Sequence, residues 1–200
     1  LPNGADDQRE QLVRRLAAND DSIDLMSLDP VFVPEFANAG YLRPFSDEEA
    51  GELTDDVLEG SLKTAMWEDK LFAAPFWANT QLLWYRKSVA EKAGIDPEAG
   101  PVTWDQIIDA AKETDTTVEV TGARYEGYMV WINSLVASAG GEVLKNPEAG
   151  KDAQPDLDSP AGKEAATIIH RLATDGVADP QLSTATEETA RNGFQADNGG

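Results

Sequence analysis

The chain has 200 residues, 41% of them hydrophobic, which suits one or two globular domains with a sizeable core. Sixteen basic residues against 37 acidic ones give a net charge of -21, which argues against binding to nucleic acid or anionic lipid. The chain contains no cysteine, which excludes disulfides, thiolate catalysis and Cys-ligated metal sites within it.

Targeting signals are the next feature to consider. There is no signal peptide, and no apolar run approaches the roughly 20 residues of a membrane span. The chain begins at Leu1 and ends in the polar run of residues 195–200. We therefore expect a segment of a longer protein, and the lack of cysteine fits an exported one.

The first elements in chain order indicate an α/β protein. Leu12, Val13 and Leu16 recur at helical spacing and predict an amphipathic helix over residues 6–18. Residues 23–28 form a short apolar run that predicts a buried strand, and a helix followed by a buried strand favours a parallel α/β layer. Asp29 follows this strand, where ligands bind in open α/β sheets. The alternative role of Asp29 is helix N-capping or an Asx turn before Pro30.

Short helices and a hairpin are expected next. Residues 34–39 predict a short helix that ends at Gly40. Acidic residues at 47–49 suit a first helical turn, and residues 55–64 repeat this pattern. Residues 65–67 and 71–76 then predict a β-hairpin.

The stretch of residues 75–87 holds two of the five tryptophans, and residues 82–86 predict a strand. Between its apolar runs lie Asn79, Thr80 and Gln81, whose amides and hydroxyl donate and accept hydrogen bonds. A neutral, hydroxyl-rich ligand needs such groups together with a flat apolar surface. A buried strand with a polar bend is the alternative interpretation.

The remaining chain predicts helices joined by short connections. Expected helices are residues 88–93, residues 103–114 behind a capping box of Thr103 and Gln106, residues 125–139, and residues 161–174 behind Ser159-Pro160. A strand is predicted at residues 116–121, and residues 146–158 predict a surface loop.

These motifs together resemble the extracellular solute-binding proteins of bacterial ABC importers, in the branch that binds sugars and in particular the trehalose-binding lipoproteins of mycobacterial importers. None of the motifs is specific alone, but their order and spacing are, over essentially all 200 residues. In order they are Ser27-Leu28-Asp29, Gly40-Tyr41-Leu42, Ala74-Pro75-Phe76, Tyr85-Arg86-Lys87, Lys92-Ala93-Gly94, Thr103-Trp104-Asp105, Tyr125-Glu126-Gly127 and Ala139-Gly140-Gly141-Glu142.

The resemblance implies a type II periplasmic-binding-protein-like fold of two lobes, with a hinge near residues 81–84 and the ligand between the lobes. The first lobe would comprise residues 1–81 and the second residues 82–200, both incomplete, because family members are roughly twice as long. Implied partners are a disaccharide, with trehalose the first candidate, and the transmembrane permease subunits of the importer. Attachment to the membrane would be only through a lipid anchor that this chain lacks, and the expected location is extracytoplasmic.

The resemblance also implies a set of ligand-binding residues. The family's strand-end acid falls on Asp29, and its polar residue after the aromatic pair falls on Asn79, where many relatives have Asp. Trp77 and Trp131 are candidates for stacking on a sugar ring, with core packing as the alternative. The further candidates to line the cleft are Glu126, Asn133, Thr80 and Gln81.

Other classes of function remain open at this point. A glycoside hydrolase would need paired carboxylates, and acids are plentiful. The lone His170 lies in an apolar helical run and has no Ser-His-Asp context. A purely structural or interaction domain is the third possibility. We expect a binding protein without catalytic residues, cofactor or metal.

Overall fold

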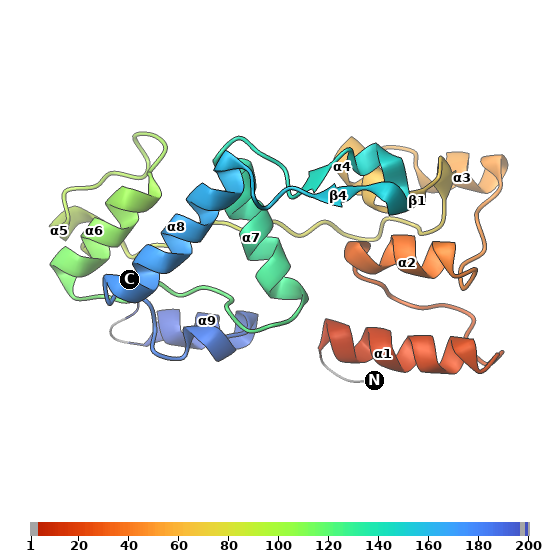
Figure 1. Ribbon diagram of the computed structural model, residues 1–200, viewed down its shortest axis with the longest axis horizontal. Coiled ribbons are helices and arrows are strands. Elements are labelled where there is room, and N and C mark those ends of the chain that lie inside the picture. Colours follow the sequence, from red (N-terminus) through yellow and green to blue (C-terminus); the bar gives the residue numbers. More distant parts are fainter. Residues whose placement is uncertain (1–3, 197–198, 200) are drawn as a thin grey trace. The chain divides into compact units, whose positions relative to one another are not determined.

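A computed structural model describes residues 4–196 and 199 (Figure 1). The chain divides into two compact units. Unit 1 is Leu1–Thr80 with Pro147–Ala153, and unit 2 is Gln81–Asn146 with Gln154–Gly200. The chain therefore passes between the units at 80/81, 146/147 and 153/154.

Unit 1 is built from short helices around a small core. Phe36 is fully buried, and its ring meets Tyr41 edge-on at 5.9 Å between centroids. Arg9 forms an ion pair with Glu35 and so links the first helix to the second. The elements are α1 (Ala5–Ala17), η1 (Pro30–Phe32), α2 (Val33–Asn38), α3 (Asp47–Leu53), α4 (Glu59–Thr64), β1 (Met66–Trp67), β2 (Lys70–Leu71) and η2 (Pro147–Asp152).

The predicted hairpin of unit 1 is present in a shortened form. β1 pairs antiparallel with β2, Met66 opposite Leu71 and Trp67 opposite Lys70. The turn residues Glu68 and Asp69 have φ of 47° and 62°, the left-handed values that a two-residue hairpin turn requires.

Unit 2 has a larger core, formed where α7 and α8 pack side by side (Figure 1). Leu135, Val136 and Leu172 are at most 1% exposed, and Ile108 of α6 closes the same cluster. The elements are α5 (Lys87–Lys92), α6 (Trp104–Thr114), α7 (Glu126–Ser138), β3 (Leu144–Lys145), β4 (Gln154–Pro155), α8 (Pro160–Thr174), η3 (Leu182–Thr184) and α9 (Glu187–Gln195).

Local capping explains the helix bounds of unit 2. Thr103 Oγ1 accepts a hydrogen bond from Gln106 N, and Gln106 Oε1 accepts one from Thr103 N at 2.8 Å, so the predicted capping box is confirmed. Ser159 caps α8 by a single hydrogen bond, which its Oγ accepts from Gly162 N at 3.2 Å. Gly140, with φ of 79°, follows the end of α7.

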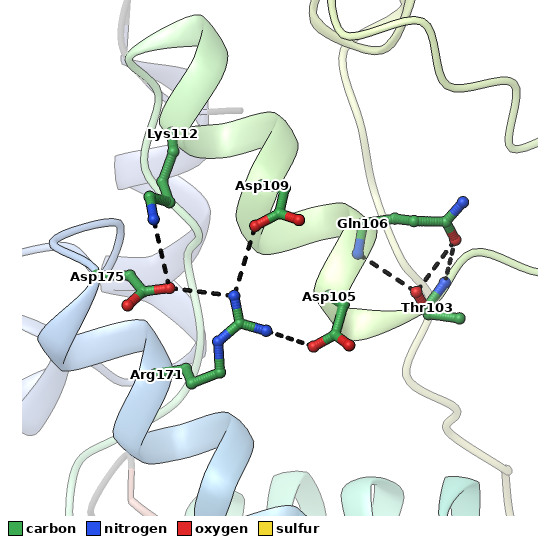
Figure 2. Close-up of polar contacts among 7 residues, drawn as sticks. All are labelled: Thr103, Asp105, Gln106, Asp109, Lys112, Arg171 and Asp175. Carbon is green, nitrogen blue, oxygen red and sulfur yellow. Dashed lines mark hydrogen bonds and ion pairs between the residues drawn. The ribbon is translucent and has the colours of Figure 1, made fainter.

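Ion pairs fasten α6 to α8 in unit 2 (Figure 2). Arg171 of α8 forms ion pairs with Asp105 and Asp109 of α6, and its Nη2 lies 3.1 Å from Asp175 Oδ2. Lys112 of α6 reaches the same Asp175 carboxylate at 3.7 Å. One guanidinium thus offsets three carboxylates that would otherwise repel one another.

The predicted strands are the main departure from expectation. Residues 23–28 and 82–86 are irregular, and residues 116–121 form only the isolated parallel bridges Thr117 to Gly199 and Val118 to Ala178. An apolar run becomes a strand only when another strand completes its ladder, and no ladder forms on these segments within residues 4–196 and 199.

Two further expectations need correction. The helix expected at 55–64 begins only at Glu59, because Asp56 adopts a left-handed φ of 59° in the preceding turn. The loop expected at 146–158 instead contains η2, and its β4 pairs with β3 before it. Gly150, with φ of 58°, allows the kink within η2.

Candidate ligand-binding site

Unit 1 contributes four of the eight predicted ligand-binding residues. Asp29 is half-buried and is the residue before η1, with φ of -67° and ψ of 145°. Its side chain makes no capping hydrogen bond, so the proposed N-cap alternative lacks its defining contact.

The other three lie on the irregular segment of residues 74–86. Trp77, Asn79 and Thr80 are all exposed, and Trp77 is 78% exposed. The rings of Phe76 and Trp77 lie 6.1 Å apart with an interplanar angle of 42°, a tilted pair. An indole this open offers a flat apolar face to a ligand, and core packing does not account for Trp77 within its unit.

Unit 2 contributes Gln81, Glu126, Trp131 and Asn133. The last three lie on α7, where residues seven apart share a face. Glu126 and Asn133 therefore lie on one face of α7, the first half-buried and the second exposed. Gln81 lies outside α7 but contacts it, because its Oε1 accepts a hydrogen bond of 2.7 Å from Ser134 Oγ.

Trp131 points to the other side of α7. It is 4% exposed and packs in the core of unit 2 beside Tyr128, with 6.0 Å between ring centroids. The alternative weighed from the sequence, core packing, describes this placement. Its Nε1 is buried and has no hydrogen-bond partner within the described part of the chain.

The start of α7 is held against the start of α9. Tyr125 Oη accepts a hydrogen bond of 3.2 Å from Glu187 N and donates one to the Glu187 carboxylate. Burial, followed by this hydrogen bond and the Glu187 charge, raises the pKa of Tyr125 well above its usual range. A Cβ at Gly127 would lie 2.3 Å from Tyr125 Oη, which explains the spacing of the Tyr-Glu-Gly motif.

Sequence reasoning missed two contacts in this region. Ser134, which holds Gln81, is exposed on α7, and no motif in the sequence singled it out. Arg86 binds the end of α9 across more than 100 residues of sequence, and no local pattern could have predicted that contact.

The concave surfaces within each unit lie elsewhere. A hollow of about 440 Å³ in unit 1 lies between α1 and the segment of residues 22–27. A second, of about 230 Å³ in unit 2, is lined partly by Glu119, Asp179 and Asn192. Neither is lined by any of the eight candidate residues, and no group of three potential metal ligands occurs in the described residues.

The sequence of the chain matches a known protein family. A family model described as bacterial extracellular solute-binding protein matches residues 2–200. The chain belongs to this family. Its membership confirms the family resemblance drawn from the ordered motifs.

Two solved structures in particular are similar to the chain. Maltose-bound MalE3 of T. maritima has a TM-score of 0.76 at 24% identity, over 99% of this chain and 50% of that one. A sugar transporter from Arthrobacter chlorophenolicus A6 with bound laminaribiose has a TM-score of 0.72 at 20% identity, over 94% and 48%. These matches confirm the fold class, that of type II periplasmic sugar-binding proteins.

A relative in sequence carries a different ligand in its name. The sn-glycerol-3-phosphate-binding periplasmic protein of Agrobacterium fabrum is 26% identical over 147 residues, which is 69% of this chain and 34% of that protein. The chain thus spans half or less of the length of these three relatives. No helix within residues 4–196 and 199 is both long and apolar enough to span a bilayer.

Proposed function

We propose that the chain forms part of the substrate-binding component of an ABC sugar importer, which binds a disaccharide and delivers it to the permease subunits. The observation that supports this proposal most is the family match over residues 2–200. The proposed location is extracytoplasmic, with a lipid anchor on the plasma membrane.

The chemistry of the eight candidate residues favours a neutral ligand. They comprise two carboxylates, Asp29 and Glu126, together with carboxamides, one hydroxyl and two indoles, and none is basic. A phosphate ester such as sn-glycerol 3-phosphate is bound most strongly by Arg or Lys, and the candidate set contains neither. Sugar hydroxyls, by contrast, donate to carboxylates and exchange hydrogen bonds with amides without a charge penalty.

Among neutral sugars, we propose trehalose first, because of the motif resemblance to trehalose-binding lipoproteins. The two similar structures hold bound maltose and bound laminaribiose. All three sugars are glucose disaccharides that offer hydroxyl groups and apolar ring faces, so the exposed face of Trp77 suits each of them. The mechanism is closure of two lobes around the sugar and docking of the closed form on the permease.

The test is calorimetry on the protein in the longest form that its gene encodes. Trehalose, maltose, laminaribiose and sn-glycerol 3-phosphate are titrated separately, and the proposal expects heat from a disaccharide and none from the phosphate ester. Aryl glycosides are included, since their turnover would instead indicate a glycoside hydrolase. Absence of heat with every sugar would overturn the proposal.

Substitution of Asn79 tests the site itself. Asn79→Ala removes amide hydrogen bonds to the sugar, and we expect a loss of about 1–3 kcal/mol in binding free energy, roughly a 5- to 150-fold rise in Kd. The matched control is Asn38→Ala, an exposed Asn at the end of α2 in the same unit. If Asn79→Ala binds the sugar with the same affinity as wild type, Asn79 does not contribute to the binding site.

A further inference from the structure

Arg86 makes a long-range contact that the proposed binding site does not use. It is the last residue of the irregular segment 74–86 and reaches the C-terminal end of α9. Its Nη2 donates to Phe194 O at 2.7 Å and to Ala196 O at 2.8 Å, and its Nε donates to Gly199 O at 2.6 Å. The guanidinium also lies over the Phe194 ring, 5.3 Å from the centroid.

The chemistry of these bonds explains why arginine occupies this position. The last carbonyls of a helix have no partner within the helix, and a cation near them is favoured by the helix dipole. A planar guanidinium can serve several carbonyls from fixed directions while it stacks on an aromatic ring. A lysine ammonium would retain the charge but could not reproduce this fork.

The other end of the same segment is also fastened to unit 2. Gln81 Oε1 accepts the hydrogen bond from Ser134 Oγ of α7. Between the two anchors, Leu82 and Trp84 are 68% and 73% exposed and so gain little from burial. Within the segment, Tyr85 Oη adds only a long hydrogen bond of 3.4 Å to Glu98 Oε1, so the position of residues 81–86 on unit 2 depends mainly on the two ends.

The crossings at 146/147 and 153/154 are also fixed by contacts within unit 2. β3 ends at Lys145, just before the crossing at 146/147, and β4 begins at Gln154, just after the crossing at 153/154. The two strands pair, with Lys145 opposite Gln154. All three crossings are thus fastened within unit 2 immediately beside the point of passage.

We propose that Arg86 is a positioning residue that keeps residues 81–86 part of unit 2 and confines bending of this connection to residues 74–80, which places the hinge just before residues 81–84, near which the family resemblance implies it. The link between this bending and sugar binding rests on the proposed function, in which Trp77, Asn79 and Thr80 of this segment bind the sugar. A sugar bound to these side chains would then act directly on the residues that bend when the lobes close.

The first test needs no ligand. Leu83→Cys and Lys163→Cys place two spin labels on exposed sites of unit 2, where this chain has no cysteine of its own; any cysteine elsewhere in the full-length protein is first replaced by serine. In the doubly labelled parent, which retains Arg86, we expect a narrow distribution of distances between the two spin labels. Arg86→Ala should broaden this distribution at least twofold, and Arg86→Lys should give an intermediate width. The control Arg191→Ala removes an ion pair of α9 with Glu188 and should leave the width unchanged.

Circular dichroism of the same samples separates positioning from folding. Broadening in Arg86→Ala with an unchanged helix signal supports the proposal. An unchanged width with an unchanged helix signal overturns it. If Arg86→Ala does not fold, the comparison of Arg86→Lys with the parent decides on the same criteria.

The second test adds the sugar that calorimetry identifies. Arg86→Ala should dissociate the sugar several-fold faster, whereas Arg191→Ala should match wild type. Equal dissociation rates in all three would overturn the link between Arg86 and binding. If wild-type protein binds no sugar, the proposed function fails, and the ligand-free spin-label result still decides the role of Arg86 in the segment.

Discussion

Buried glycines show most directly how single residues fix this structure. Gly162 lies in the first turn of α8, and a Cβ there would lie 2.1 Å from the carbonyl oxygen of Leu157 and 2.6 Å from its carbonyl carbon. Side chains can rotate away from such a clash, but a backbone carbonyl cannot. The position therefore tolerates only glycine while residue 157 stays in place.

We expect Gly162→Ala to lower the free energy of unfolding by about 1–3 kcal/mol, despite the higher helix propensity of alanine. The matched control is Gly51→Ala in α3, where no atom lies within 4 Å of the added Cβ. That change should stabilise by roughly 0.5–1 kcal/mol. Urea unfolding of both variants measures the two values, and the same sign for both would contradict the steric argument.

The Glu119 carboxyl provides a residue-scale prediction about pH. Burial raises its pKa, the charge of Asp179 adds to this effect, and the hydrogen bond from Thr117 opposes it. Folding therefore favours protonated Glu119. This contribution to stability is fully present below the unfolded pKa near 4.3 and is lost as pH rises through the higher folded pKa.

We expect Glu119→Gln, which mimics the neutral carboxyl, to raise Tm at pH 7 by roughly 1–3 °C and to leave it unchanged at pH 3.5. The amide oxygen can still accept the hydrogen bond from Thr117. Glu113→Gln, at an exposed position of α6, serves as the control. A gain that is equal at both pH values would show that titration of Glu119 is not its cause.

At the scale of elements, the ion pairs between α6 and α8 allow a test of how the helices are joined. Arg171 is 28% exposed and faces Asp105, Asp109 and Asp175 (Figure 2). Single surface ion pairs contribute little, but removal of this guanidinium leaves three carboxylates without their common partner.

We expect Arg171→Gln to lower the free energy of unfolding by about 1 kcal/mol at low salt. Added salt screens the remaining carboxylates, so the loss should shrink in roughly 0.5 M NaCl. Arg191→Gln, which removes one exposed pair within α9, should cost less than about 0.5 kcal/mol. Equal losses for Arg171→Gln at both salt concentrations would indicate packing rather than charge.

The elements also show which features the sequence could predict. The helices with local start and stop signals, such as Thr103 with Gln106 or Ser159 with Pro160, are confirmed to within one or two residues. The local hairpin is confirmed in a shortened form, but the predictions of isolated strands are wrong, because such a strand depends on a distant partner that local patterns do not reveal. Residues 23–28 and 82–86 have strand composition but form no ladder.

The same distinction applies to the candidate site. Helical spacing correctly groups Glu126 and Asn133 on one face of α7. Composition alone could not separate Trp131, which is buried in the core, from Trp77, which is exposed, because each is flanked by apolar residues and followed two residues later by an asparagine. The roles of all eight residues in ligand binding stay predictions.

The whole molecule is dominated by negative charge. With 37 acidic and 16 basic residues, repulsion among carboxylates outweighs the attractions that the ion pairs supply. Salt weakens both effects, but it weakens the larger one more in absolute terms.

We therefore expect Tm to rise by several degrees when NaCl increases from about 10 mM to about 150 mM at pH 7. Choline chloride at equal concentration should produce the same rise, because screening depends on ionic strength and not on the identity of the cation. A rise with sodium alone would indicate specific ion binding, and a fall in Tm would contradict the dominance of repulsion.

The return of residues 147–153 to unit 1 has a practical consequence. Gly150 lies against the Trp67 ring, with its would-be Cβ 3.2 Å from the indole, so this short excursion packs on the hairpin of the unit. Truncation after Thr80 would remove that cover from Trp67. A single cut in the gene after residue 80 would therefore separate residues 1–80 from residues 147–153, which pack together in unit 1. Residues 147–153 joined to residues 1–80 through a designed linker would keep unit 1 together.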